Sequence, residues 1–147
     1  MLERGQELSA DLVLVRLLGA GSTGEVWLAQ DSGQRNREPC GFVAVKVLSA
    51  ELAREDATCA ALRDECARVA ALTHPNIVRI DGLYRSARHA WIAMDYAAGG
   101  DLAQLRGRPC GEILQAAIPV AAALAAAHDT GLIHRDVKPA NVLLSRF

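Results

Sequence analysis

The sequence has no excess of charge of one sign. Its 147 residues carry 16 Lys and Arg against 17 Asp and Glu, which gives a formal net charge of −1. A protein that binds nucleic acid through its phosphates needs a basic surface. The composition therefore gives no electrostatic case for a nucleic-acid partner. Arg35 and Arg37 are the nearest approach to a basic cluster, and we interpret them as part of a solvated loop.

The sequence also lacks paired cysteines. Cys40, Cys59, Cys66 and Cys110 form no Cys-x-x-Cys pair, and none has a histidine at metal-ligand spacing. This pattern favours reduced, unpaired thiols, which are typical of a cytosolic protein. The sequence therefore predicts a cytoplasmic location.

Long apolar runs are missing as well. The N-terminus, Met1 to Gly5, lacks the apolar stretch of a signal peptide. The most apolar segment, Ala116 to Ala127, is too short to span a bilayer and contains Pro119. Its richness in Ala predicts a buried or half-buried helix. We therefore expect no membrane segment in this chain.

The sequence does contain a series of short apolar strands. Runs rich in Val, Leu and Ile predict five of them, at 12–18, 25–29, 42–48, 77–84 and 89–96. The glycine-rich segment from Gly19 to Gly24 predicts a turn that joins the first two strands into a hairpin. The polar segment 31–41 contains Gly, Asn and Pro, which predicts a loop.

Two long helices complete the pattern. Apolar residues on one side predict a helix over 50–72, and a second helix over 112–128 should be distorted near Pro119 and end at Gly131. Asp101 is a candidate N-cap for a short helix over 101–105.

This order predicts an α+β fold with two lobes, because one helix is inserted after the third strand and mostly helix follows the last. The first lobe spans 10–96 and a flexible hinge spans 97–100. Residues 101–147 form the start of the second lobe, which is incomplete.

The richest segment for chemistry is His134-Arg135-Asp136-Val137-Lys138-Pro139-Ala140-Asn141. Pro139 forbids helix continuation, which predicts a structured loop leading into a short strand over 141–144. Asp136 can accept a hydroxyl proton, Lys138 can bind a phosphate, and Asn141 can offer oxygen to a hard metal. Phosphoryl transfer with Mg²⁺ needs these three groups. The alternative is a polar turn whose charges are simply solvated.

The order and spacing of this segment resemble the catalytic loop of protein kinases. A Lys two residues after the Asp is similar to Hanks-type serine/threonine kinases, and Val-Lys-Pro-Ala-Asn looks like their bacterial members. The resemblance implies that Asp136 accepts or orients the substrate hydroxyl proton. It also implies that Lys138 stabilises charge on the transferred phosphate, that Asn141 binds Mg²⁺ and that His134 packs inward.

The glycine pattern Gly19-x-Gly21-x-x-Gly24-x-Val26 agrees with this family. A dinucleotide-binding fold uses a similar pattern, but its turn leads into a helix, whereas Val26 and Trp27 suit a second strand. The segment therefore resembles the kinase glycine-rich loop, whose backbone can approach phosphates because glycine has no Cβ. The alternative is an ordinary hairpin turn.

Lys46 ends the apolar run Val43-Ala44-Val45-Lys46, where a half-buried cation is costly unless it is paired. The resemblance supplies the partners, namely the α- and β-phosphates of ATP and a Glu on the following helix. Glu65 is the matching Glu, and Asp64 and Glu55 are weaker candidates. An edge-strand Lys in water is the alternative.

The segment Met94-Asp95-Tyr96-Ala97 resembles the connection between the two kinase lobes. The resemblance implies that Met94 lies beside the adenine and that backbone groups of Asp95 and Ala97 hydrogen-bond the base. Asp101 would then reach the ribose, unless it serves only as an N-cap. The resemblance also implies four residues that sandwich the adenine, although each is equally explained as ordinary core: Leu18, Val26, Ala44 and Leu143.

The resemblance covers residues 10 to 144 and implies transfer of the ATP γ-phosphate to Ser or Thr of a protein substrate, with Mg²⁺. It requires Lys46 and Asp136 to converge on one cleft. The family continues with Asp-Phe-Gly, whose Asp holds a Mg²⁺, but no Asp or Gly follows Asn141. We therefore expect a partial kinase domain with little activity alone. Two alternatives remain, a non-catalytic nucleotide-binding pseudokinase or scaffold module and a small-molecule phosphotransferase, which Lys138-Pro139 disfavours.

Overall fold

The computed structural model describes residues 2–33 and 41–145. Arg35, Arg37 and Cys40 lie outside these residues. The chain divides into two compact units, which are described separately. Unit 1 comprises Met1–Ala71 and Arg79–Tyr96, and unit 2 comprises Leu72–Val78 and Ala97–Phe147.

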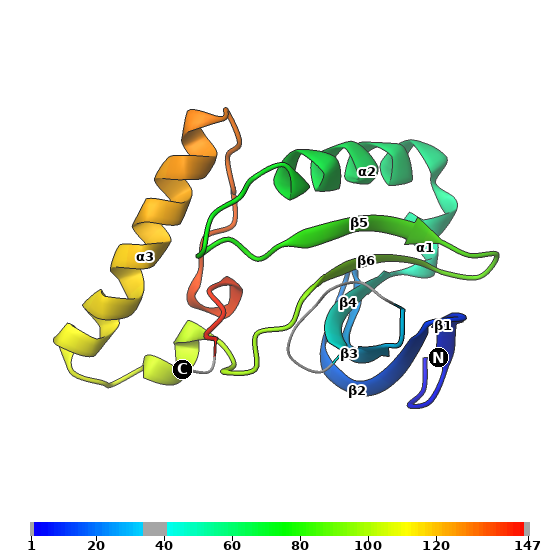
Figure 1. Ribbon diagram of the computed structural model, residues 1–147, viewed down its shortest axis with the longest axis horizontal. Helices are drawn as coiled ribbons and strands as arrows, with labels where there is room; N and C mark the ends of the chain where they lie inside the picture. Colours follow the sequence, from blue (N-terminus) through cyan, green and yellow to red (C-terminus); the bar gives the residue numbers. More distant parts are fainter. Residues whose placement is uncertain (1, 34–40, 146–147) are drawn as a thin grey trace. The chain divides into compact units, whose positions relative to one another are not determined.

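Unit 1 is built on an antiparallel sheet of six strands in the order β1-β2-β3-β4-β6-β5 (Figure 1). The strands are β1 Glu7–Ser9, β2 Leu12–Gly21, β3 Gly24–Asp31, β4 Phe42–Leu48, β5 Ile80–Arg85 and β6 Ala90–Asp95. The α+β architecture predicted from the sequence is confirmed, but the prediction of five strands missed β1. With only three residues, β1 is too short to show an alternating pattern.

The hydrophobic core of unit 1 lies on one face of this sheet. Strand β4 shows the alternation, because Val43, Val45 and Val47 are buried in the core cluster and the residues between them face the other way. The other buried members of the cluster come mainly from neighbouring strands: Leu8, Leu12, Leu14, Trp27, Ala29 and Trp91. The opposite face of β4 therefore presents Ala44 and Lys46.

The predicted helix over 50–72 is two helices, α1 Ala50–Arg54 and α2 Asp56–Ala70. Glu55 separates them in an extended conformation, with φ −87° and ψ 101°, and is both the C-cap of α1 and the N-cap of α2. No Gly or Pro marks the break in the sequence. Helix α2 lies along β5 (Figure 1) and buries Cys59 and Cys66.

Unit 2 contains the 3₁₀ helix η1 Leu102–Leu105, the helix α3 Cys110–Asp129 and the 3₁₀ helix η2 Pro139–Asn141. Gly131 follows α3 with φ +79°, as expected for a glycine that ends a helix. The strand predicted over 141–144 is absent from the described residues. Its place is taken by η2 and a single β-bridge between Asp101 and Leu143.

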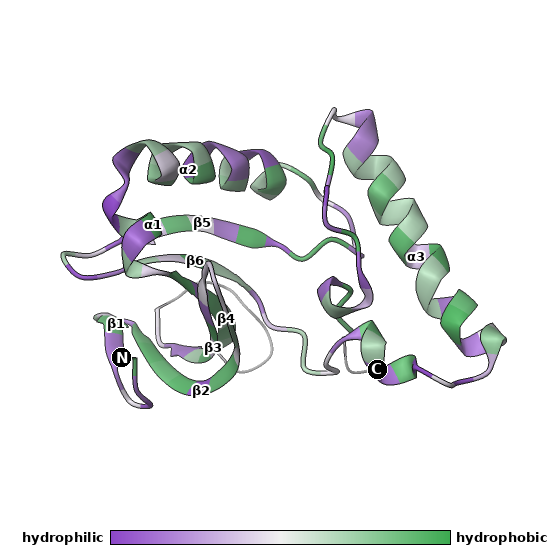
Figure 2. Ribbon diagram, turned by 180° about the vertical axis from the view of Figure 1, so that it is seen from behind, coloured by the Kyte–Doolittle hydropathy of each residue, from purple (hydrophilic) through white to green (hydrophobic). Residues whose placement is uncertain are grey.

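Helix α3 exposes most of its apolar surface. Ala123 and Ala127 are its only buried residues, whereas Leu114 and Ile118 are 54% and 66% exposed. With 20 residues, the helix is long and apolar enough to cross a membrane, by length and composition only (Figure 2). The core helix of a larger soluble domain can have the same length and composition. The prediction that the chain has no membrane segment therefore stays a prediction.

Candidate active site

The predicted catalytic residues of unit 2 converge on one carboxylate oxygen. Oδ2 of Asp136 accepts a hydrogen bond from Nζ of Lys138 at 2.8 Å and another from Nδ2 of Asn141 at 2.9 Å. Nδ2 of Asn141 also donates to the backbone carbonyl of Asp136 at 2.8 Å. Within residues 2–33 and 41–145, Oδ1 of Asp136 receives no hydrogen bond. That oxygen therefore remains available to a substrate hydroxyl.

The local backbone explains how these three side chains meet. Arg135 adopts φ +63°, which costs energy for a residue with a side chain and turns the chain sharply before Asp136. Lys138 then precedes Pro139, which opens η2, and the N–H of Asn141 donates to the Lys138 carbonyl at 2.9 Å. The single turn of η2 brings Asn141 back to Asp136.

His134 has a local role that was not predicted from the sequence. Its side chain is exposed, so the expectation that it packs inward is wrong for this structure. Its Nδ1 accepts the backbone N–H of Asp136 at 3.3 Å, which supports the sharp turn at Arg135. The spacing alone could have predicted this contact, because a His two residues before a backbone N–H can close such a turn.

Hydrogen bonds set the electrostatics of Asp136. The ammonium of Lys138 first, and the amide of Asn141 second, lower the pKa of the Asp136 carboxyl below its ordinary value. Asp136 is therefore a carboxylate at neutral pH. A carboxylate with a low pKa is a weak base, so it suits orienting a hydroxyl and accepting its proton late in the reaction.

Asn141 fits a magnesium ligand. Because its Nδ2 donates to Asp136, its Oδ1 is the atom that could meet a cation, and oxygen is the ligand that Mg²⁺ prefers. Among the residues that the structure describes, no three His, Cys, Asp or Glu side chains group into a metal site. The donor set therefore fits a Mg²⁺ that takes most of its ligands from nucleotide phosphates and water.

In unit 1, the glycine-rich turn is shorter than the sequence predicted, because β2 continues to Gly21 and β3 begins at Gly24. Ser22 and Thr23 alone form the turn. Gly24 has φ +134°, and a Cβ there would clash with the backbone oxygen of Val47. A Cβ at Gly19 or Gly21 would meet no atom within 4 Å. The backbone at these two glycines is therefore open to the approach of a ligand.

The sheet brings several predicted nucleotide-binding residues onto one face. Lys46 pairs with Val26 on β3, and Ala44 pairs with Met94 on β6. Residues directly opposite each other on antiparallel strands point to the same side, as do residues two apart on one strand. Val26, Ala44, Lys46 and Met94 therefore share a face.

Two further residues of this set lie where β2 ends. Gly19 pairs with Val26, and Leu17 pairs with Trp27. The register shift between these pairs leaves Leu18 without a directly opposed partner on β3.

Glu65 does not pair with Lys46 in this structure. The described residues contain no ion pair between them, and Glu65 is exposed on α2 next to buried Cys66. Burial, followed by the charge of Glu65, raises the pKa of the Cys66 thiol. Of the weaker candidates, Glu55 accepts a hydrogen bond from Oγ1 of Thr58 at 2.7 Å, and Asp64 is exposed. The role of Glu65 stays a prediction.

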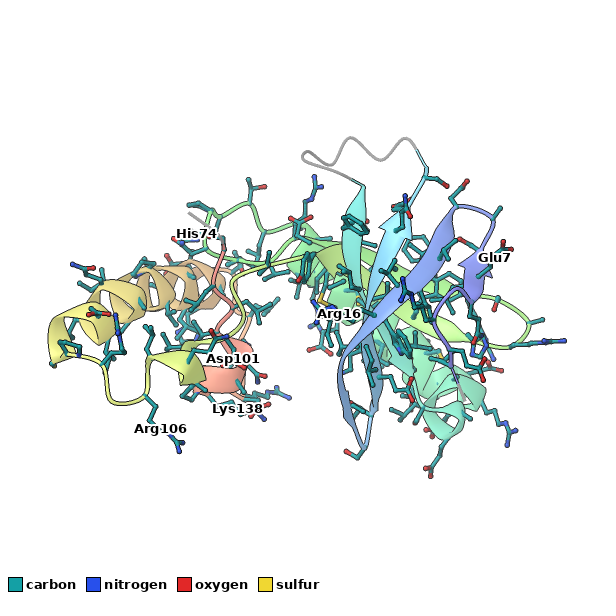
Figure 3. The ribbon with its side chains drawn as sticks, turned by 90° about the horizontal axis from the view of Figure 1, so that it is seen from below. Glu7, Arg16, His74, Asp101, Arg106 and Lys138 are labelled. Atoms are coloured by element: carbon teal, nitrogen blue, oxygen red, sulfur yellow. The ribbon has the colours of Figure 1, made fainter. Side chains whose placement is uncertain are left out.

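Two arginines hold the end of unit 1 from which the predicted hinge leaves. Arg79 lies 3.6 Å from the Asp95 carboxylate, and its carbonyl accepts the Asp95 N–H at 3.0 Å. Nη2 of Arg16, labelled on β2 in Figure 3, donates to the Tyr96 hydroxyl at 3.3 Å. Neither contact was predicted from the sequence, because neither periodicity nor a motif connects these residues.

In unit 2, the predicted hinge is tied to the end of the catalytic loop. The N–H of Gly99 donates to the Leu144 carbonyl at 2.7 Å, and a Cβ at Gly99 would clash with that carbonyl. Oδ1 of Asp101 accepts the Ala103 N–H at 2.9 Å, which makes Asp101 the N-cap of η1. Its contact with a ribose stays a prediction.

The predicted site residues are divided between the two units. Unit 1 holds Leu18, Gly19, Gly21, Gly24, Val26, Ala44, Lys46, Glu65, Met94 and Asp95, and unit 2 holds Ala97, Asp136, Lys138, Asn141 and Leu143. The convergence of Lys46 and Asp136 on one cleft, like the adenine sandwich that includes Leu143, stays a prediction.

Comparison with known proteins gives consistent matches. Residues 12–146 match the protein kinase domain family. Serine/threonine-protein kinase PknI of Mycobacterium tuberculosis is 39% identical over 142 residues, which cover 92% of this chain and 23% of that protein. PknF of the same organism is 35% identical over 142 residues, covering 92% of this chain and 29% of its own.

A crystal structure of the Mycobacterium tuberculosis PknI kinase domain matches with a TM-score of 0.77 and 38% identity. The match covers 99% of this chain and 58% of that one. The chain thus spans 23% to 29% of the length of the curated relatives PknI and PknF.

Proposed function

This chain belongs to the protein kinase family, and from that premise we propose that it supplies the ATP-binding and catalytic-loop part of a serine/threonine protein kinase. The reaction is transfer of the γ-phosphate of ATP to a Ser or Thr hydroxyl of a protein substrate, with Mg²⁺. One observation carries the proposal, namely that Lys138 and Asn141 hold the Asp136 carboxylate through the same oxygen.

This arrangement separates two tasks on one side chain. Oδ2 is held by its two donors, so Oδ1 is presented in a defined direction to the substrate hydroxyl. Positioning of this kind, together with charge stabilisation, supplies most of the catalysis of phosphoryl transfer. The Lys138 ammonium at 2.8 Å from Oδ2 lies close enough to meet the negative charge of the arriving phosphoryl group.

The sheet supports the nucleotide side of the proposal. Lys46 would bind the α- and β-phosphates, and the open backbone at Gly19 and Gly21 would cover them. Val26, Ala44 and Met94 provide an apolar surface on the same face as Lys46, which suits an adenine ring. Bound Mg²⁺ would neutralise phosphate charge, with Asn141 among its ligands.

Two observations favour Ser and Thr as acceptors and the cytoplasm as the location. Lys138 stands where serine/threonine kinases have Lys, and the relatives PknI and PknF are named serine/threonine kinases. Cys59, Cys66 and Cys110 are unpaired, which suits a reducing compartment.

Nucleotide binding tests the proposal directly. Thermal unfolding of the 147-residue polypeptide is measured with ATP and Mg²⁺, with ATP and a chelator, and without nucleotide. We expect Mg²⁺-ATP to raise Tm by mass action, and the variant Lys46→Met to lose most of that rise. Arg88→Met is the matched control, because Arg88 is an exposed cation of the same unit outside the site. A rise that survives Lys46→Met would contradict the assignment of the phosphate site.

Turnover is tested with labelled ATP, Mg²⁺ and a generic Ser/Thr substrate. A polypeptide of these residues alone has no Asp-Phe-Gly after Asn141, so we expect nucleotide binding with little phosphate transfer. Robust transfer that Asp136→Asn abolishes would contradict this expectation of low activity while supporting the role of Asp136. Transfer that persists in Asp136→Asn would contradict that role.

A further inference from the structure

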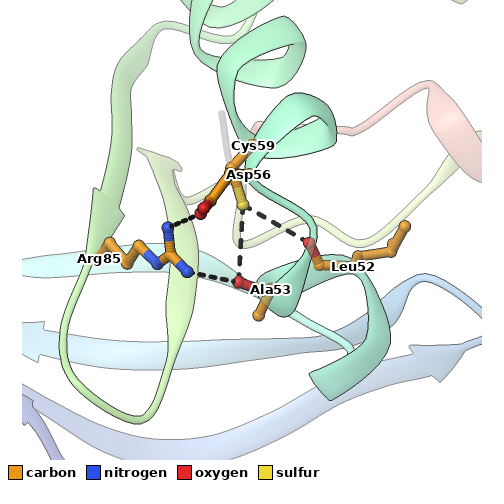
Figure 4. A network of polar contacts seen from close by, with 5 residues as sticks. All are labelled: Leu52, Ala53, Asp56, Cys59 and Arg85. Atoms are coloured by element: carbon orange, nitrogen blue, oxygen red, sulfur yellow. Dashed lines mark hydrogen bonds and ion pairs between the residues drawn. The ribbon is translucent and has the colours of Figure 1, made fainter.

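The break between α1 and α2 is held by one arginine from the end of β5. Nη1 of Arg85 donates to Oδ1 of Asp56 at 2.6 Å, and Nη2 donates to the Ala53 carbonyl at 3.1 Å (Figure 4). The thiol of Cys59 points to the same turn, with its Sγ 3.8 Å from the Ala53 carbonyl and 3.5 Å from that of Leu52. The guanidinium of Arg85 and the thiol of Cys59 thus share the Ala53 carbonyl at the junction of the two helices.

The chemistry of the guanidinium suits this junction. Ala53 lies in the last turn of α1, where backbone carbonyls carry partial negative charge, and Asp56 opens α2, where a carboxylate is favoured. Both sites attract the same cation. The planar fork of Arg presents two N–H groups in a fixed geometry, which a Lys ammonium cannot reproduce.

Packing alone leaves the position of α2 weakly defined. Only Cys59 and Cys66 of its 15 residues are buried, and both are small side chains. A helix whose buried side chains are this few and small can slide along its strand, as packed helices do in shear motions. A directional contact at the first turn would remove that freedom.

We propose that Arg85 is a positioning residue that fixes the α1–α2 junction on β5 and thereby sets where α2 presents Glu65. The inference rests on the proposed function for the role of Glu65, although the junction itself does not. Arg85 acts through α2 and touches neither nucleotide nor substrate.

The competing explanation is a surface ion pair of no consequence. The side chains of Arg85 and Asp56 are 44% and 84% exposed, and exposed pairs often contribute little to stability. On that explanation, Cys59 and Cys66 position α2 by themselves. The two explanations differ in what happens to the backbone of α1 and α2 when the guanidinium is removed.

Hydrogen exchange of the 147-residue chain makes this comparison. Arg85→Met keeps an aliphatic stem but removes both donors, and Arg88→Met is the matched control in the same hairpin. We expect Arg85→Met to accelerate amide exchange over residues 50–68 by about two- to fivefold, the range of a single exposed charge pair. Arg85→Lys should give an intermediate effect, and Arg88→Met should match the wild type. Unchanged exchange around Glu65 in Arg85→Met would overturn the proposal, as would equal acceleration throughout unit 1.

Nucleotide affinity supplies a second readout. We expect Arg85→Met to weaken Mg²⁺-ATP binding by about two- to fivefold and to have no further effect in a Glu65→Gln background, because the proposed effect of Arg85 passes through the Glu65 carboxylate. Equal weakening in both backgrounds would overturn the route through Glu65. If the wild-type chain binds no ATP, the proposed function fails, whereas exchange around Glu65 still decides whether Arg85 positions α2.

Discussion

Nδ2 of Asn141 donates to both the backbone carbonyl and Oδ2 of Asp136, at 2.8 and 2.9 Å, so one amide closes the catalytic loop. The contact couples two functions that the sequence could only assign separately. Asn141 cannot turn its Nδ2 to a nucleotide without releasing Asp136, and Asp136 cannot swing away without freeing the proposed metal ligand. The carboxylate and the proposed metal ligand therefore move together.

The first prediction concerns the titration of Asp136. Its pKa is lowered by Lys138 and Asn141, so we expect the carboxyl to titrate below the ordinary value of about 3.9. A lowered pKa in the folded state contributes stability that is present above the unfolded pKa and is lost as pH falls through the folded pKa. Carboxyl ¹³C NMR over the acid range measures the titration directly.

Two variants test the cause of that shift. Lys138→Met should raise the pKa of Asp136, because it removes the donor that lowers this pKa the most. Arg106→Met removes an exposed cation elsewhere in unit 2 and should leave the titration unchanged. An Asp136 that titrates identically in the wild type and in Lys138→Met would show that the 2.8 Å contact is not formed in solution.

The second prediction concerns the role of Asn141 in binding Mg²⁺. Asn141→Leu keeps the size of the side chain but removes the donors to Asp136 and the oxygen for Mg²⁺. We expect it to reduce the rise in Tm produced by Mg²⁺-ATP while leaving the smaller effect of ATP with a chelator unchanged. Asn76→Leu, an exposed amide elsewhere in unit 2, serves as the control. Equal losses with and without Mg²⁺ would argue against a metal role.

The sequence was most informative where a strand is marked by its own apolar residues. The apolar run over 42–48 predicted β4 with the bounds that the structure shows. The sequence was least informative where a residue far away along the chain contacts the end of an element. Nothing near Glu55 signals the break between α1 and α2, because Arg85 reaches that junction from about thirty residues away.

The same division applies to the candidate site. Resemblance to a family identified Asp136, Lys138 and Asn141, but spacing could not reveal that Lys138 and Asn141 share one oxygen of Asp136. The predicted strand over 141–144 was wrong because its partner segment contains Gly99 and Gly100, which pair through isolated backbone contacts. Strand propensity alone does not supply a partner strand.

The third prediction dissociates stability from nucleotide binding within the glycine-rich hairpin. Gly24→Ala places a Cβ against the Val47 backbone oxygen at φ +134°, where strain alone costs about 1–3 kcal/mol. Gly21→Ala meets no atom within 4 Å, so its Tm should change little. Its Cβ would instead occupy space that we assign to phosphates, so its affinity for Mg²⁺-ATP should fall. Calorimetry gives both quantities, and a Gly24→Ala variant as stable as Gly21→Ala would refute the close approach of β3 to β4.

The fourth prediction concerns the exposed apolar side of α3. Ile118 is 66% exposed, so Ile118→Gln should change the free energy of unfolding by no more than about 0.5 kcal/mol. It should lower self-association of the 147-residue polypeptide, because large exposed apolar surfaces promote contacts between molecules. Ala123→Gln is the control, since Ala123 is 8% exposed and a buried amide there should destabilise the fold.

Light scattering measures self-association in this series, and sedimentation with lipid vesicles measures membrane binding. We expect wild-type polypeptide to associate with itself and not with vesicles, because α3 contains Pro119 and its last turn hydrogen-bonds to the residues that follow it. Vesicle binding that Ile118→Gln abolishes would contradict this and assign the apolar side of α3 to a membrane. Self-association that is identical in Ile118→Gln and the wild type would show that another surface drives it.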